Sequence, residues 1–214
     1  MAATTYSLQL AIKLNKAVIT NAGLDNGKII LSKLLDNDDL NSLGIHENMS
    51  INIKLLAEIC ETAGAPGYEQ RIREIVIREV EPFVDELRTD NMGNLTAVVK
   101  GKKDKKVMIG AHMDEIGFIV THIDDNGFVY FHTLGGFDPK TLTAQRVIIH
   151  GNKDIMGVMG SKPIHLMNAT DRAKTPTIKD YFIDTGMSRK ELEKIVTIGD
   201  TITRERELVC LQKI

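Results

Sequence analysis

Residues 111–118 read Ala-His-Met-Asp-Glu-Ile-Gly-Phe. They follow the apolar run 107–110, and together these residues predict a buried parallel strand over 107–111. His112 and Asp114 are two residues apart, so on an extended chain their side chains project to the same side. Imidazole is a good ligand for zinc or cobalt, and open α/β sheets build their sites at the carboxyl ends of parallel strands. The stretch therefore indicates a metal site, with a purely structural histidine as the alternative.

Composition limits the classes of function. The chain has 214 residues, 43% hydrophobic and 26% charged, with a formal net charge of −2. This gives room for a core but no basic field for nucleic acid, and no apolar run approaches the roughly 20 residues that span a bilayer. Cys60 and Cys210 are far apart and lie in apolar contexts, which favours reduced thiols. We therefore expect a cytoplasmic globular protein, with no nucleic acid and no membrane as a partner.

The segment from Met49 has the pattern of an α/β domain. Apolar residues fall at helical spacing over 53–63 and again over about 68–80, where Pro82 ends the second helix. Strand candidates then follow at 84–87 and 95–100, before the run that leads to His112. Two helices followed by closely spaced strands are typical of the opening of an α/β domain.

The pattern changes after residue 116, where short β-type runs dominate. Asn126-Gly127 predicts a tight hairpin turn, because glycine accepts a positive φ. One helix is expected at about 189–195, capped by Ser188 with Glu191 three residues on. These features predict a small β-barrel or sandwich. The expected strands are 117–122, 127–132, 146–150 and 155–159.

Residues 1–48 carry no recognisable site chemistry. They are rich in Asn, Asp, Leu and Lys, and the apolar residues of 29–35 suggest a short helix. We expect a weakly structured leader or an appended helical pair.

Other candidate residues are weaker than His112, Asp114 and the adjoining Glu115. His122 and His132 alternate with apolar residues, so both are expected to face solvent. The basic cluster 102–106 is interpreted as a solvated turn, with an anion site as the alternative. The sequence has neither the Gly-rich loop that binds phosphate nor the Gly-x-Ser-x-Gly elbow of serine hydrolases.

From Met49 to about Val209 the chain resembles the self-assembling cobalt- or zinc-dependent aminopeptidases. This group includes glutamyl and deblocking aminopeptidases and enzymes once called endoglucanase M. The motifs that carry the resemblance occur in the family's order along the chain. They are Pro66-Gly67-Tyr68-Glu69, Asp90-Asn91-Met92-Gly93-Asn94-Leu95, the block at 111–118, Gly135-Gly136-Phe137-Asp138, the run 157–163 and Ile198-Gly199-Asp200.

The resemblance implies an α/β/α peptidase domain interrupted by a small PDZ-like β-barrel subdomain that mediates dimerisation. On this chain 49–116 would be the first part of the peptidase domain and 117–205 the dimerisation subdomain. Residues 1–48 would be an atypical extension, and 206–214 would re-enter the peptidase domain. The implied partners are peptides, as substrates, and further copies of the chain.

The resemblance also implies a mechanism in which two divalent ions, zinc or cobalt, activate a water molecule. His112 matches a metal ligand, and Asp114 matches the catalytic carboxylate that orients this histidine. The family's bridging Asp, general-base Glu and remaining ligands follow the β-subdomain and have no counterpart here, so at most one ion is expected to bind.

We therefore expect a metal-dependent aminopeptidase by descent, truncated and inactive as given. A circular permutation, with residues 24–26 as a displaced ligand segment, is an alternative explanation for the missing half. A non-catalytic assembly module from the same family is the alternative function.

Overall fold

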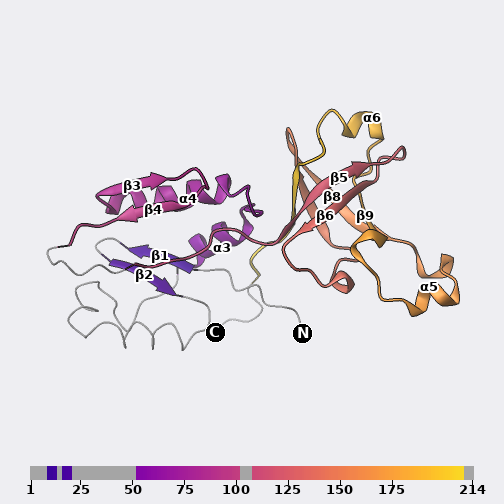
Figure 1. Ribbon diagram of the computed structural model, residues 1–214, viewed down its shortest axis with the longest axis horizontal. Helices are drawn as coiled ribbons and strands as arrows, with labels where there is room; N and C mark the ends of the chain where they lie inside the picture. The colour runs from indigo at the N-terminus through magenta and orange to yellow at the C-terminus, as the bar shows by residue number, and fades with distance from the viewer. Residues whose placement is uncertain (1–8, 14–15, 21–51, 102–107, 210–214) are drawn as a thin grey trace. The chain divides into compact units, whose positions relative to one another are not determined.

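The computed structural model describes residues 9–13, 16–20, 52–101 and 108–209. The chain divides into two compact units (Figure 1). The first comprises Met1–Thr62 and Glu69–Met113, and the second comprises Ala63–Tyr68 and Asp114–Ile214. Several predictions fall outside the described residues: the ligand segment 24–26, the helix at 29–35, the basic cluster 102–106 and the environment of Cys210.

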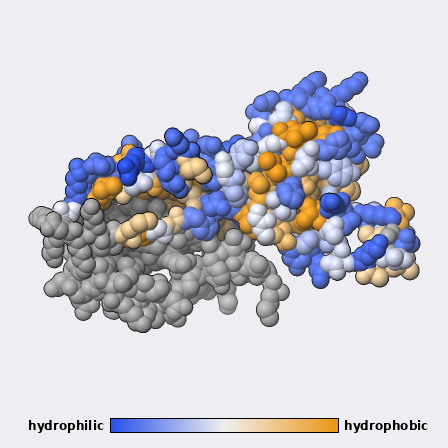
Figure 2. Space-filling view, viewed as in Figure 1, coloured by the Kyte–Doolittle hydropathy of each residue, from blue (hydrophilic) through white to orange (hydrophobic). Residues whose placement is uncertain are grey.

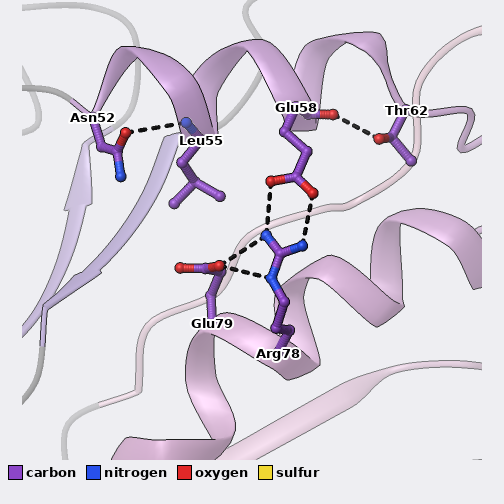
Figure 3. Close-up of polar contacts among 6 residues, drawn as sticks. All are labelled: Asn52, Leu55, Glu58, Thr62, Arg78 and Glu79. Atoms are coloured by element: carbon purple, nitrogen blue, oxygen red, sulfur yellow. Dashed lines mark hydrogen bonds and ion pairs between the residues drawn. The ribbon is translucent and has the colours of Figure 1, made fainter.

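Two helices of the first unit are joined by an ion pair. α3 (Ile53–Glu61) begins where the Asn52 side chain accepts a hydrogen bond from the Leu55 amide at 3.1 Å. α4 (Gln70–Val80) carries Arg78, whose guanidinium donates two 2.7 Å bonds to the Glu58 carboxylate on α3 (Figure 3). This bidentate geometry matches the fork of an arginine to a carboxylate. Both helices lie where the spacing of apolar residues predicts them.

Two strands of the first unit form a hairpin next to α4. The short 3₁₀ helix η1 (Glu81–Phe83) contains the expected proline and leads into β3 (Glu86–Thr89), which pairs antiparallel with β4 (Leu95–Val98). Arg73 on α4 donates to the carbonyl of Gly93 in the hairpin turn at 2.9 Å. Both strands overlap the predicted ranges, 84–87 and 95–100.

The predicted buried strand at 107–111 is wrong over its described part. Residues 108–116 have no regular secondary structure, and Met108 and Ile109 are 93% and 40% exposed. An apolar run becomes a buried strand only where neighbouring strands pair with it and cover both faces. Among the described residues every strand pairing is antiparallel and none involves this run.

The expectation for the N-terminal segment also needs correction. β1 (Gln9–Lys13) and β2 (Lys16–Thr20) pair as an antiparallel hairpin, so this part is not a helical pair. The apolar residues Leu8, Leu10 and Ile12 recur at every second position, which is the period of a strand and not of a helix.

The second unit is a closed six-stranded barrel with strand order β10-β5-β6-β9-β8-β7 (Figure 1). The predicted barrel or sandwich is therefore a barrel. The strand predicted at 146–150 is confirmed with its ends, and the other three predicted strands are confirmed with shifted ends. The strands β9 and β10 were not predicted. The bounds are β5 (Gly117–Ile123), β6 (Val129–Leu134), β7 (Arg146–His150), β8 (Asp154–Ser161), β9 (Tyr181–Asp184) and β10 (Thr201–Arg204).

Alternating apolar residues of these strands fill the barrel. Phe118 is fully buried, stacks on Phe137 with ring centroids 4.2 Å apart, and meets Phe131 edge-on at 5.0 Å. Ile183 and Ile202, from the two unpredicted strands, are also fully buried. Burial of such side chains stabilises a domain by about 1.5–3 kcal/mol each, so the barrel has a core of its own.

Short helices connect the strands of the second unit. The 3₁₀ helices η2 (Pro139–Thr141), η3 (Ile164–Leu166) and η4 (Ile178–Asp180) and the helix α5 (Ala169–Ala173) lie between β6 and β9. α6 (Arg189–Leu192) is the predicted helix, and the amide and hydroxyl of Ser188 both donate to Glu191, as the cap motif predicts. No helix among the described residues is long and apolar enough to cross a membrane.

Candidate functional site

His112 and Asp114 lie on the irregular segment that joins the two units. His112 is exposed and belongs to the first unit, whereas Asp114 is half-buried and belongs to the second. The unit boundary falls between Met113 and Asp114, so the geometry of each residue is described within its own unit. An exposed imidazole is accessible to an ion from solvent, which suits the predicted role of a ligand.

Glu115, the third polar residue of the motif, is held at two points. Its amide donates to the carbonyl of Gly64 at 2.8 Å, and its carboxylate forms an ion pair with the guanidinium of Arg206. The Glu115 side chain is 17% exposed and that of Arg206 32%. Sequence reasoning noted Glu115 but missed Arg206, because nothing in the local sequence connects positions so far apart.

The segment 63–68 packs on the barrel beside Glu115. Ala65 is buried, and a Cβ added to Gly117 would lie 3.1 Å from the Cβ of Ala65 and 2.8 Å from the carbonyl oxygen of Ile202. The hydroxyl of Tyr68 donates to the carbonyl of Gly199 at 3.4 Å. Two motifs that are distant in sequence, at 66–69 and 198–200, therefore meet next to the 111–118 block.

The motif that begins at Gly135 supports the same block. Gly135 has φ +98°, which favours glycine, and an added Cβ would lie 2.4 Å from Cγ2 of Ile116. Two residues on, Phe137 stacks on Phe118. These contacts fix the chain at 116–118, so this motif has a structural role in the described part of the chain.

The remaining histidines of the described residues are not gathered into a site. His122 and His132 are exposed, as predicted. The side chain of His150 is 9% exposed, and its ring nitrogens lie 3.0 Å from Oδ1 of Asp154 and 2.9 Å from Oγ1 of Thr203. These bonds join β7 to β8 and β10, which indicates a structural role for His150. His165 is exposed in η3.

The described residues do not hold a complete metal site. Within the ranges that the structure describes, no group of three or more His, Cys, Asp or Glu side chains could bind an ion. A zinc ion is usually bound by four ligands, and a centre with two ions needs more. The exposed imidazole of His112 fits one ligand position, and the described part of the chain does not supply the others.

The family model described as M42 glutamyl aminopeptidase matches residues 93–214, more than half of the chain. The chain belongs to this family. Membership implies dependence on divalent metal ions.

Similar proteins each cover about three quarters of the chain. The FrvX protein of Escherichia coli (strain K12) is 40% identical over 164 residues, which cover 75% of this chain and 46% of that protein. The TET aminopeptidase of a marine sediment Thaumarchaeota archaeon superposes with a TM-score of 0.71 at 32% identity. The match covers 75% of this chain and 45% of the aminopeptidase chain.

A third similarity is to an assembled peptidase. The TET1 peptidase of Pyrococcus horikoshii, which can assemble into a tetrahedron or a large octahedral shell, has a TM-score of 0.66 at 32% identity. The match covers 74% of this chain and 48% of that one. The chain therefore spans less than half the length of the relatives it matches.

Proposed function

We propose that this chain is part of a metal-dependent aminopeptidase that removes N-terminal residues from peptides. The observation that carries the proposal is the His112-Met113-Asp114 motif, inside a region that matches an aminopeptidase family over more than half of the chain. The similarity to a solved TET aminopeptidase, with a TM-score of 0.71, supports the same reaction class.

Two residues would carry the chemistry present on this chain. His112 would supply an imidazole ligand to a zinc or cobalt ion, and Asp114 would orient this histidine and raise its basicity. A bound divalent ion polarises a carbonyl group and lowers the pKa of a bound water molecule. The other ligands and the general base would come from residues outside those that the structure describes.

We expect the described residues by themselves not to catalyse hydrolysis, because no group of three or more metal-binding side chains is present among them and His112 alone cannot hold two ions. The test combines metal analysis of the purified chain with an assay of aminoacyl-nitroanilide hydrolysis in added Zn²⁺ or Co²⁺. We expect fewer than two tightly held ions per chain and no turnover. Two bound ions together with turnover would contradict this expectation.

The domain assignment remains part of the proposal. Residues 49–116 would form the first part of an α/β/α peptidase domain, and 117–205 a PDZ-like dimerisation subdomain. Residues 1–48 would be an appended segment, and 206–214 the return to the peptidase domain. A cytoplasmic location also stays a prediction from the composition.

A second candidate function is assembly with further copies of the chain. The barrel is closed and has its own core. On β8, the apolar residues Met156 and Val158 are 54% and 43% exposed to solvent. Figure 2 shows apolar side chains gathered on one face of the barrel unit. The similar TET1 peptidase from P. horikoshii can assemble into a tetrahedron or a large octahedral shell, which supports a homo-oligomer here.

Light scattering tests this second function. We expect an oligomer at micromolar concentration that dissociates in Met156→Lys. Met92→Lys is the matched control, because Met92 is 84% exposed in the turn between β3 and β4. A monomer in the wild-type chain would count against assembly.

A further inference from the structure

Three segments that are distant in sequence meet at the residue that follows Asp114. The amide of Glu115 donates to the carbonyl of Gly64 at 2.8 Å, and its carboxylate pairs with the guanidinium of Arg206. All three residues belong to the second unit. We call the ion pair Glu115–Arg206, together with the Gly64 carbonyl, the clasp.

The clasp is better shielded from water than the ion pairs at the barrel surface. Its side chains are 17% and 32% exposed, whereas the pair between Arg189 and Asp125 is 40% and 94% exposed. Solvent screens exposed pairs strongly, so a half-buried pair holds its geometry more firmly. The clasp can therefore act as a fixed point of the backbone.

The residues next to the clasp in sequence are also held. Ile116 and Gly117, which follow Glu115, pack against Gly135 and against Ala65 and the backbone of β10, respectively. Glu205, which precedes Arg206, donates its amide to the carbonyl of Arg146 at 3.0 Å, and its carboxylate lies 2.9 Å from Nε of Arg146. The clasp joins these two fixed segments.

We propose that Glu115 and Arg206 are positioning residues: they hold the backbone at Glu115 and thereby fix the orientation of the neighbouring Asp114. The inference rests on the role of Asp114 in the proposed function. Asp114 directly precedes Glu115, so the backbone torsions between them determine where the Asp114 carboxylate lies.

The experiment compares the wild-type 214-residue chain with Glu115→Gln, Arg206→Met and Arg206→Lys. Two quantities are measured: the exchange rate of the Glu115 amide by NMR, and the affinity of the chain for Co²⁺ by isothermal titration calorimetry. Arg189→Met is the matched control, because it removes an arginine from more exposed ion pairs of the same unit. Amides of β5 and β10 report whether each variant remains folded.

We expect faster exchange at Glu115 and weaker Co²⁺ binding in Glu115→Gln and Arg206→Met. The loss of affinity should be up to about tenfold, the lower end of the effect of removing a residue that orients a metal ligand. Arg206→Lys keeps the positive charge, so it should retain most of the slow exchange at Glu115 and most of the Co²⁺ affinity. Arg189→Met should behave as the wild-type chain.

Two results would overturn the inference. Unchanged exchange in both charge-removing variants would show that the clasp does not hold the backbone. Faster exchange with unchanged Co²⁺ affinity would show that the clasp stabilises the barrel without positioning Asp114. Failure of the proposed function is separate, since His112→Ala with undiminished Co²⁺ affinity would exclude His112 as a ligand without changing the exchange rates.

Discussion

Gly127 lies so close to Met187 that a Cβ at position 127 would be 2.3 Å from the Met187 carbonyl oxygen. Gly127 also has φ +87°, and its amide donates to the carbonyl of Asp124 at 3.1 Å in the turn between β5 and β6. A single residue without a side chain thus lets this turn pack against the segment before α6.

Gly127→Ala is expected to destabilise the barrel by about 2–5 kcal/mol, because about 1–2 kcal/mol for the left-handed backbone adds to about 1–3 kcal/mol for the clash. Gly186→Ala is the matched control, since Gly186 has φ +70° with nothing within 4 Å of an added Cβ. The control should lose only about 1–2 kcal/mol for the left-handed backbone. Urea unfolding followed by circular dichroism measures both, and equal losses would contradict the role of the close approach.

Phe118→Ala is expected to lower the free energy of unfolding by about 3–5 kcal/mol, the usual loss for a fully buried phenylalanine. Phe118 is 0% exposed and packs on both Phe131 and Phe137. Phe118→Leu keeps much of the volume and should lose less. A loss below about 1 kcal/mol in Phe118→Ala would show that the ring is not central to the core.

The cap of α6 should weaken in acid. The hydroxyl and amide of Ser188 donate to Glu191 and lower the pKa of its carboxyl group. Because the pKa of Glu191 is lower in the folded state, its ionised carboxylate stabilises that state at pH values above the unfolded pKa of about 4.3. This contribution is lost as the pH falls through the folded pKa.

Amide exchange in α6 between pH 6 and pH 3 measures this effect. We expect Glu191→Gln to remove most of the pH dependence at the start of the helix. Glu193→Gln should keep it, because Glu193 pairs with Arg189 instead. Equal pH profiles in the wild-type chain and Glu191→Gln would refute the assignment.

Much of the fold follows from local sequence signals. The turn at Gly127 and a helix that begins at Arg189 were predicted because tight turns and capping depend on residues a few positions apart. The helix ends at Leu192, earlier than the expected 195. β10 was missed because Thr201 and Thr203 look like the exposed face of a strand, yet they are 6% and 4% exposed. Their burial depends on barrel closure, which no short stretch of sequence encodes.

The candidate site was only partly predictable. The motif at His112 and Asp114 is local, and together with the other motifs in the family's order it predicted the family that the comparison found. The apolar run before it suggested a buried strand, but such a strand forms only where neighbouring strands cover it. Arg206, which pairs with Glu115, could not be found from the sequence because their contact depends on the closed barrel.

The central claim is that His112 is a metal ligand of an aminopeptidase centre. The most direct measurement is a Co²⁺ titration of the 214-residue chain, followed by broadening of the histidine ring signals, in the wild type, His112→Ala and His132→Ala. His132 is also exposed and lies on the barrel, so it is the matched control. We predict that Co²⁺ broadens His112 first, and that His112→Ala lowers the affinity by at least about tenfold while His132→Ala does not. The same affinity in the wild-type chain and His112→Ala would contradict the claim.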